Sequence, residues 1–235
     1  CFGNFITQDG RKNYKRYVVL FTCLASRAVH LELVEDLSTD SFINALRCLI
    51  AIRGPVKLIQ SDCGTNFVGA ANEFVKAQNE NNDAVKNFLT RVKCEFRTNT
   101  PSASHMGGVW ERQIRTARGV LAGILERNKC RLSTATLRTL LYEVMAIINS
   151  RPLAVEGLYS DPTLVPICPN DLLTMKSNVA LPPPGTFSDA DVYSRKRWRQ
   201  VQRLANVFWE GWRKTYLASL QTRQKWSDKK RCLKE

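Results

Sequence analysis

The chain has 235 residues, of which 44% are apolar and 24% are charged, and this composition excludes a wholly disordered chain. No uninterrupted apolar run reaches the ~18 residues that a transmembrane helix requires, so we expect no membrane partner. The formal net charge of +14 instead predicts a polyanionic partner, and nucleic acid is the usual one.

The positive charge is concentrated near the end of the chain. Residues 191–235 hold 13 Lys+Arg and 4 Asp+Glu, a net charge of +9. A basic segment on a less basic body favours binding to nucleic acid, and a solvated basic helix is the alternative interpretation. The eight cysteines are widely spaced without a C-x-x-C pair, and there are only two histidines, which argues against a zinc site. We therefore expect a reducing, intracellular compartment.

The apolar periodicity predicts strands that give way to alternating strands and helices. Asp9-Gly10 indicates a hairpin turn, Ser38 and Thr39 can cap a helix, and Gly54-Pro55 ends it. The expected strands are 1–8, 16–24, 28–34, 56–60 and 94–98, and the expected helices are 40–52, 70–92, 109–127 and 134–149. This order predicts a mixed α/β sheet covered by helices.

The last third of the chain has a different character. Residues 152–190 are rich in proline and are predicted to form a connector, and residues 191–226 return to a helical pattern. An aromatic and apolar stripe along this helix predicts a packing face, made of Trp198, Leu204, Phe208, Trp212, Tyr216 and Leu220.

One candidate functional residue is Asp62, in the segment SDCGTNF that follows strand 56–60. An acid at the carboxyl end of a strand lies where open α/β sheets bind ligands. The alternative is an acid that only caps a turn.

A second candidate group begins at Glu111, in the first turn of the predicted helix 109–127 and just after Gly107-Gly108. Arg115 and Arg118 follow one and two turns later, on the same helix face as Glu111. A carboxylate beside two guanidinium groups suits phosphodiester chemistry. The alternative is a local ion pair between Glu111 and Arg115, worth about 0.3–0.5 kcal/mol.

Three ordered segments carry a resemblance to a known family: SRAVHLELVEDLSTDSF, RGPVKLIQSDCGTNFVGA and PSASHMGGVWER. They resemble the integrase catalytic core of Pao/BEL-type long-terminal-repeat retrotransposons, and the resemblance covers roughly residues 1–175. It implies a ribonuclease-H-like mixed sheet of five strands, the first truncated, flanked by helices. The implied domains are a catalytic core at 1–151, the connector at 152–190, and a basic helical extension at 191–235 that begins a truncated C-terminal domain.

The same resemblance assigns roles to the candidate residues. Asp62 and Glu111 match the second and third acids of the D-D-E triad and would hold two Mg²⁺ or Mn²⁺ ions. Arg115 and Arg118 would hold backbone phosphates of DNA. Asn66 would orient the substrate, unless it makes only a local turn hydrogen bond.

The first acid of the triad would immediately precede Cys1, so it is expected to be missing and catalysis is expected to be impaired. Asp9, in the hairpin turn, is a poor substitute, and Glu32 and Glu35 are weak ones.

The resemblance implies metal-dependent processing of DNA 3′ ends and strand transfer, which joins the ends of the element to target DNA. The alternative is a non-catalytic nucleic-acid-binding protein derived from a transposable element. A ribonuclease H proper fits the order of the carboxylates poorly. By analogy, we expect a homo-oligomer that is intracellular, and nuclear when it acts on DNA.

Overall fold

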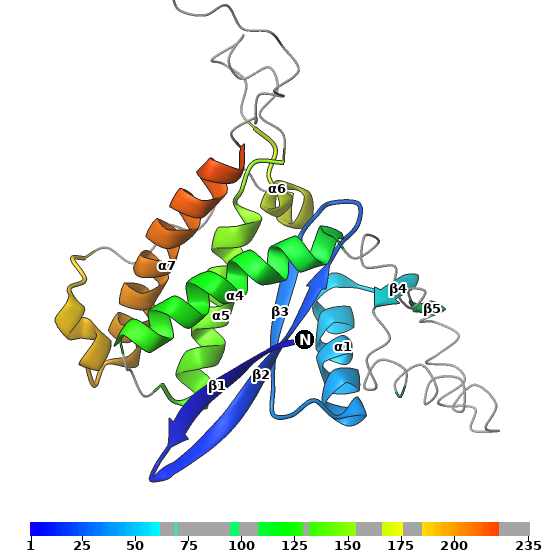
Figure 1. The fold of residues 1–235 in the computed structure, drawn as a ribbon. Helices are drawn as coiled ribbons and strands as arrows, with labels where there is room; N and C mark the ends of the chain where they lie inside the picture. Colours follow the sequence, from blue (N-terminus) through cyan, green and yellow to red (C-terminus); the bar gives the residue numbers. More distant parts are fainter. Residues whose placement is uncertain are drawn as a thin grey trace, which may run out of the picture.

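The computed structural model describes residues 1–61, 69, 95–98, 108–128, 132–153, 166–175 and 185–220 (Figure 1). The strands are β1 (Phe2–Asp9), β2 (Lys12–Thr22), β3 (Val29–Val34), β4 (Leu58–Ser61) and β5 (Glu95–Thr98). The helices are α1 (Thr39–Arg53), α4 (Gly108–Asn128), α5 (Thr134–Asn149), α6 (Pro169–Thr174) and α7 (Arg197–Leu220), with a 3₁₀ helix η2 (Asp189–Tyr193). None of the helices described is long and apolar enough to cross a membrane.

The first three strands form an antiparallel sheet in the order β1-β2-β3. The turn between β1 and β2 lies where Asp9-Gly10 predicts it. Gly10 has a φ of 65°, and such tight turns use glycine there because it has no Cβ to clash. This confirms the predicted hairpin and the mixed α/β class.

The expected single sheet of five strands differs from what the structure shows. Within the described residues, β4 and β5 pair in parallel as a separate two-stranded sheet, and β1 pairs only with β2. β4 is four residues long, and the side chain of Leu58 at its start is 38% exposed. Such a strand has little apolar surface to bury, so its joining the larger sheet, as the five-stranded expectation required, lacks a strong driving force.

The predicted helix ends agree with the structure where local chemistry sets them. The Ser38 hydroxyl accepts a hydrogen bond from the Ser41 N–H (3.2 Å), which caps α1, and Gly54 ends that helix with φ 87°. The Ser133 hydroxyl caps α5 by accepting from the Thr136 N–H (3.2 Å). The helix predicted at 70–92 lies outside the described residues.

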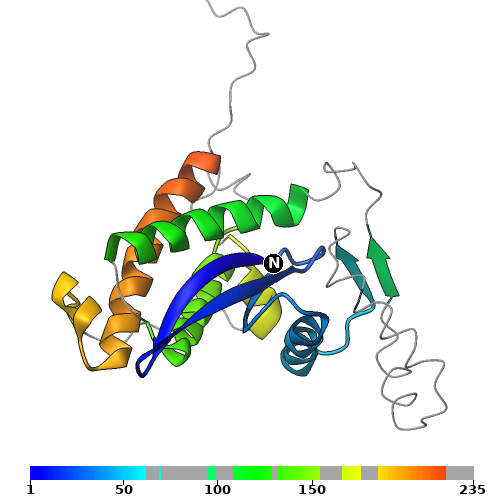
Figure 2. The same cartoon turned by 60° about the horizontal axis from the view of Figure 1, so that its bottom comes forward.

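Helices cover both faces of the three-stranded sheet (Figures 1 and 2). On one face, α1 packs against a small cluster that includes Val19, Val34 and Phe42. On the other face, α4, α5 and α7 share one large core with the strands. Its helical members include Ala117, Leu121 and Ile124 of α4, Leu137, Leu140, Val144 and Ile148 of α5, and Val201, Leu204, Phe208 and Trp212 of α7.

The aromatic stripe of α7 behaves as predicted along most of its length. Phe208, Trp212 and Tyr216 stack with ring centroids 6.0 and 5.9 Å apart, and the Tyr216 hydroxyl donates to the Pro152 carbonyl (2.6 Å). The prediction is wrong for Trp198, whose side chain is 51% exposed. Trp198 lies in the first turn of α7, before the helix reaches the core.

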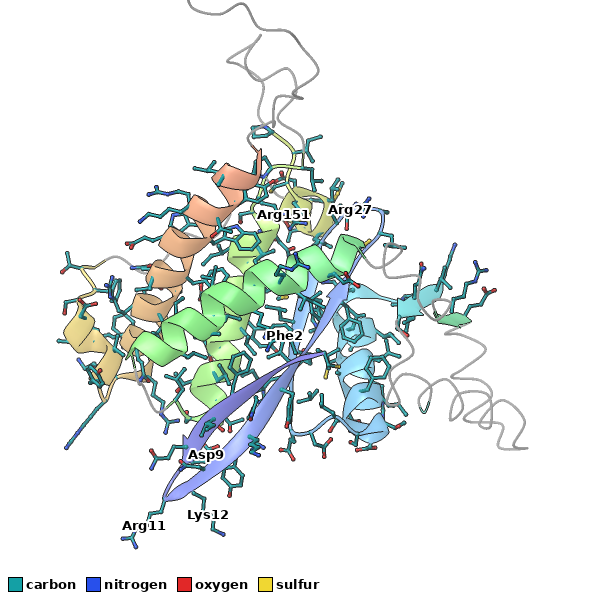
Figure 3. All side chains as sticks on the ribbon, in the orientation of Figure 1. Phe2, Asp9, Arg11, Lys12, Arg27 and Arg151 are labelled. Carbon is teal, nitrogen blue, oxygen red and sulfur yellow. The ribbon has the colours of Figure 1, made fainter. Side chains whose placement is uncertain are left out.

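The end of α5 is fastened to the sheet by a buried amide. The Val29 N–H donates to Asn149 Oδ1 (2.7 Å), and Asn149 Nδ2 donates to the Val29 carbonyl (2.8 Å). The guanidinium of Arg151 donates to the carbonyls of Ile148 and Arg27, which ties α5 to the β2–β3 turn (Figure 3). These contacts satisfy backbone groups at the edge of the sheet.

Replacing Asn149 with alanine should lower the free energy of unfolding by about 2–4 kcal/mol, because two buried backbone groups lose their partners. Urea unfolding followed by circular dichroism measures this change. Asn44→Ala is the control, since Asn44 makes an exposed hydrogen bond to Asp40 (3.2 Å). Equal losses in both variants would contradict the special role of Asn149.

Candidate functional site

The predicted site residues of α4 lie together on its solvent face. Glu111 is in the first turn, and Glu111, Arg115 and Arg118 are all exposed. The opposite face of α4 carries Ala117 and Leu121, which are fully buried in the core. The burial of that face fixes the rotation of the helix, so the carboxylate and both guanidinium groups are directed to solvent.

The beginning of α4 lies at the end of the molecule where β4 and β5 are found (Figures 1 and 2). β4 ends at Ser61, and Asp62 is the next residue in the chain. Asp62 and Asn66 themselves lie outside the described residues. The structure therefore brings Glu111, Arg115 and Arg118 onto one face.

The described residues do not form a metal site by themselves. Among them there is no group of three or more His, Cys, Asp or Glu side chains arranged to hold a metal ion. Of the expected metal ligands, Glu111 is described and Asp62 is not. We therefore derive no chemical step through a metal ion from these residues.

The acids considered as substitutes for the first triad position are engaged elsewhere. Asp9 accepts hydrogen bonds from the Thr134 hydroxyl and N–H, and the hydroxyl, with smaller effects of Arg16 and Arg197, lowers the pKa of Asp9. Glu32 is buried, with His30 Nε2 at 3.2 Å and the Tyr142 hydroxyl at 3.3 Å.

Glu35, the third of these acids, lies 3.9 Å from the Arg16 guanidinium at the end of the sheet, with 80% of its side chain exposed. All three substitutes therefore have structural partners.

A second group of cations, which the sequence analysis counted but did not place, lies at the other end of the molecule. Arg195, Lys196 and Arg197 are exposed where η2 leads into α7. The tip of the β1–β2 hairpin, with Arg11 and Lys12, lies at the same end (Figures 1 and 3). In the sequence, the charge excess of residues 191–235 was the signal that pointed to Arg195, Lys196 and Arg197.

Comparisons of the chain with known proteins found the following similarities. A family model described as "Family of unknown function (DUF5641)" matches residues 196–235. No curated protein matches. Among solved structures, the chain is similar to the HTLV-2 integrase catalytic core domain in complex with magnesium (trimeric form), with 16% identity over 65% of this chain and 85% of that chain and a TM-score of 0.41. It is also similar to a chain of the simian T-cell lymphotropic virus intasome in complex with PP2A regulatory subunit B56 gamma, with 17% identity over 69% of this chain and 54% of that chain and a TM-score of 0.44.

Removing the two guanidinium groups of α4 tests whether this face contacts DNA. In the double variant Arg115→Gln/Arg118→Gln, the slope of log affinity against log salt concentration should become shallower by about 1.8 on duplex DNA, because each phosphate contact contributes about 0.9. Fluorescence anisotropy with a labelled duplex measures the slope. The control is Arg138→Gln, an exposed arginine of α5, and the same slope in all proteins would exclude this face from the interface.

Proposed function

We propose that the chain is an integrase-type polynucleotidyl transferase core of the Pao/BEL class, the type that processes DNA 3′ ends and joins them to target DNA, and that its catalysis is impaired because Asp62 and Glu111 supply two of the three triad acids. One observation carries the proposal: Glu111, Arg115 and Arg118 share the exposed face of α4, and α4 begins at the end of the molecule where β4 leads into Asp62. A carboxylate followed by two guanidinium groups can hold a cation and the adjacent phosphates of a nucleic-acid strand.

Each residue has a distinct role in this proposal. Asp62 and Glu111 supply hard oxygen ligands for Mg²⁺ or Mn²⁺, which, when bound, supplies charge stabilisation at phosphorus and activation of the attacking oxygen. Arg115 and Arg118 bind backbone phosphates, and their fixed position on α4 sets the register of the strand. Asn66 orients the nucleotide next to Asp62. The exposure of Glu111 leaves its carboxylate accessible to a ligand.

The partners follow from the same chemistry. The net charge of +14 favours DNA, both the element ends and the target, through a salt-dependent phosphate interface. The similar HTLV-2 integrase catalytic core domain is known in complex with magnesium in a trimeric and a dimeric form. For this chain, divalent cation use and self-association are part of the proposal, as is action in the nucleus, where the target DNA lies.

Glu111→Gln and Asp62→Asn should each weaken Mn²⁺ binding at least tenfold, because each removes one of the charged ligands that the proposal requires. Isothermal titration calorimetry measures the affinity, and a gel assay with labelled DNA ends measures cleavage and joining. Glu143→Gln is the matched control, since Glu143 is an exposed acid of α5. Unchanged Mn²⁺ binding in both test variants would remove the catalytic proposal.

A second candidate function is a non-catalytic nucleic-acid-binding protein derived from a transposable element. The observation that favours it is the excess of basic residues, which requires no metal to bind DNA. Under this candidate, Asp62→Asn and Glu111→Gln leave Mn²⁺ affinity unchanged, and DNA binding is equal with and without a chelator.

A further inference from the structure

Trp198 is an exposed aromatic residue at the start of α7, outside the stretch where Phe208 and Trp212 are buried in the core. Its side chain is 51% exposed, whereas Phe208 and Trp212 of the same helix are 0% and 3% exposed. A large apolar ring is costly to leave in water, so its position calls for an explanation.

The orientation of the Trp198 ring is fixed by its neighbours. The Phe187 ring meets it edge to face, with centroids 5.9 Å apart at an interplanar angle of 87°. The Arg199 guanidinium carbon lies 5.5 Å from the Trp198 centroid and 5.3 Å from the Phe187 centroid. The ring therefore has an aromatic ring and a cation as neighbours, while the residue stays 51% exposed.

Arg199 is itself immobilised. Its Nε donates to Asp191 Oδ1 (2.6 Å), and its Nη2 donates to Asp191 Oδ2 (3.1 Å) and to the Thr186 carbonyl (3.2 Å). Asp191 also accepts from the Ser188 N–H (2.9 Å), which fixes the carboxylate to the start of η2. A bidentate pair of this kind is rigid, so the exposed ring is preorganised before any ligand arrives.

Three exposed cations directly precede Trp198 in the chain. Within the described part of the chain, the ion pairs of residues 195–203 involve Arg199 with Asp191 and Arg203 with Asp189. Arg195, Lys196 and Arg197 are exposed and precede Trp198 directly. We name Arg195, Lys196, Arg197 and Trp198 the basic–aromatic surface.

The hairpin tip extends this positive field. The start of α7 and the end of β1 lie at the same end of the molecule (Figures 1 and 2). Arg11 and Lys12 project from the tip of the hairpin at this end of the molecule (Figure 3).

We propose that the basic–aromatic surface binds single-stranded nucleic acid, with a base stacked on Trp198 and the flanking phosphates held by Arg195, Lys196 and Arg197. A flat, preorganised ring beside cations matches an unpaired base and its backbone, because a base exposes its face only when it is unstacked. An acidic peptide offers negative charge but no flat face for the ring.

This surface is separate from the proposed catalytic site. It lies at the end of the molecule away from β4 and β5, and α4, with its 21 residues, spans roughly 30 Å at 1.5 Å per residue. The inference therefore does not rest on the proposed catalysis.

The test uses the full chain and a fluorescein-labelled 12-nucleotide oligothymidine, with binding followed by anisotropy. Trp198→Ala should weaken binding by about 5- to 100-fold, the loss expected for one stacked base. The matched control is Trp209→Ala, because Trp209 lies on the same helix and is 44% exposed, and this variant should bind as the wild-type chain does. Thermal unfolding of each variant confirms that it is folded.

A charge series separates the two parts of the surface. The triple variant Arg195→Gln/Lys196→Gln/Arg197→Gln should make the salt slope on the single strand shallower by about 2, at about 0.7 per phosphate, whereas Trp198→Ala should leave the slope unchanged. Arg213→Gln/Lys214→Gln, two exposed cations further along α7, is the control for net charge.

Wild-type affinity for oligothymidine in a folded Trp198→Ala chain would overturn the proposal, as would an equal loss of affinity in Trp209→Ala. Binding of a labelled poly-glutamate peptide is measured in parallel, and a triple variant that loses only this binding would also overturn it. The last result would assign the surface to an acidic protein partner.

Discussion

The pairing of the Asn149 amide with the backbone of Val29 is the contact on which the arrangement of this molecule depends. β3 is an edge strand of the sheet, and its first residue has backbone groups that a buried environment must satisfy. The side chain of Asn149 supplies both a donor and an acceptor at that edge. The end of α5 is thereby fixed to the sheet, and the apolar face of α5 is placed over its centre.

α4 packs mainly on α7 and on strands β1 and β2. The fully buried side chains of α4 pack into the core that α5 and α7 share with β1, β2 and β3. Because Ala117 and Leu121 occupy the inner face, the outer face presents residues on the other side of the helix, among them Glu111, Arg115 and Arg118. The chemical character of the exposed face is thus a consequence of how the apolar stripe is buried.

The features that could be predicted from sequence are those that nearby residues decide. The hairpin at Gly10, the cap at Ser38 and the stop at Gly54 each depend on a few adjacent positions, and all are found where expected. The boundaries of α5 agree with the expected residues 134–149 because a serine cap and a continuous apolar stripe both specify them.

Features decided by distant residues were not predictable in the same way. The separation of β4 and β5 from the larger sheet depends on how much surface β4 can bury against distant strands, and the pattern of each segment alone does not reveal how little β4 offers. The exposure of Trp198 depends on where α7 meets the core, although its helical spacing is the same as that of Phe208. The placement of the start of α7 and the end of β1 at the same end of the molecule likewise arises only when the chain is folded. For the candidate site, the shared face of Glu111, Arg115 and Arg118 could be predicted, while Asp62 and Asn66 stay predictions.

The burial of α7 has a practical consequence for anyone who shortens this chain. Phe208 and Leu204 are completely covered, and they cover in turn the apolar flanks of α4 and α5. A fragment that ends within the proline-rich stretch would expose those flanks to water as a broad apolar surface, and such surfaces drive aggregation. Soluble preparations of the N-terminal part should therefore carry the chain at least through Tyr216, whose hydroxyl is bonded back to Pro152.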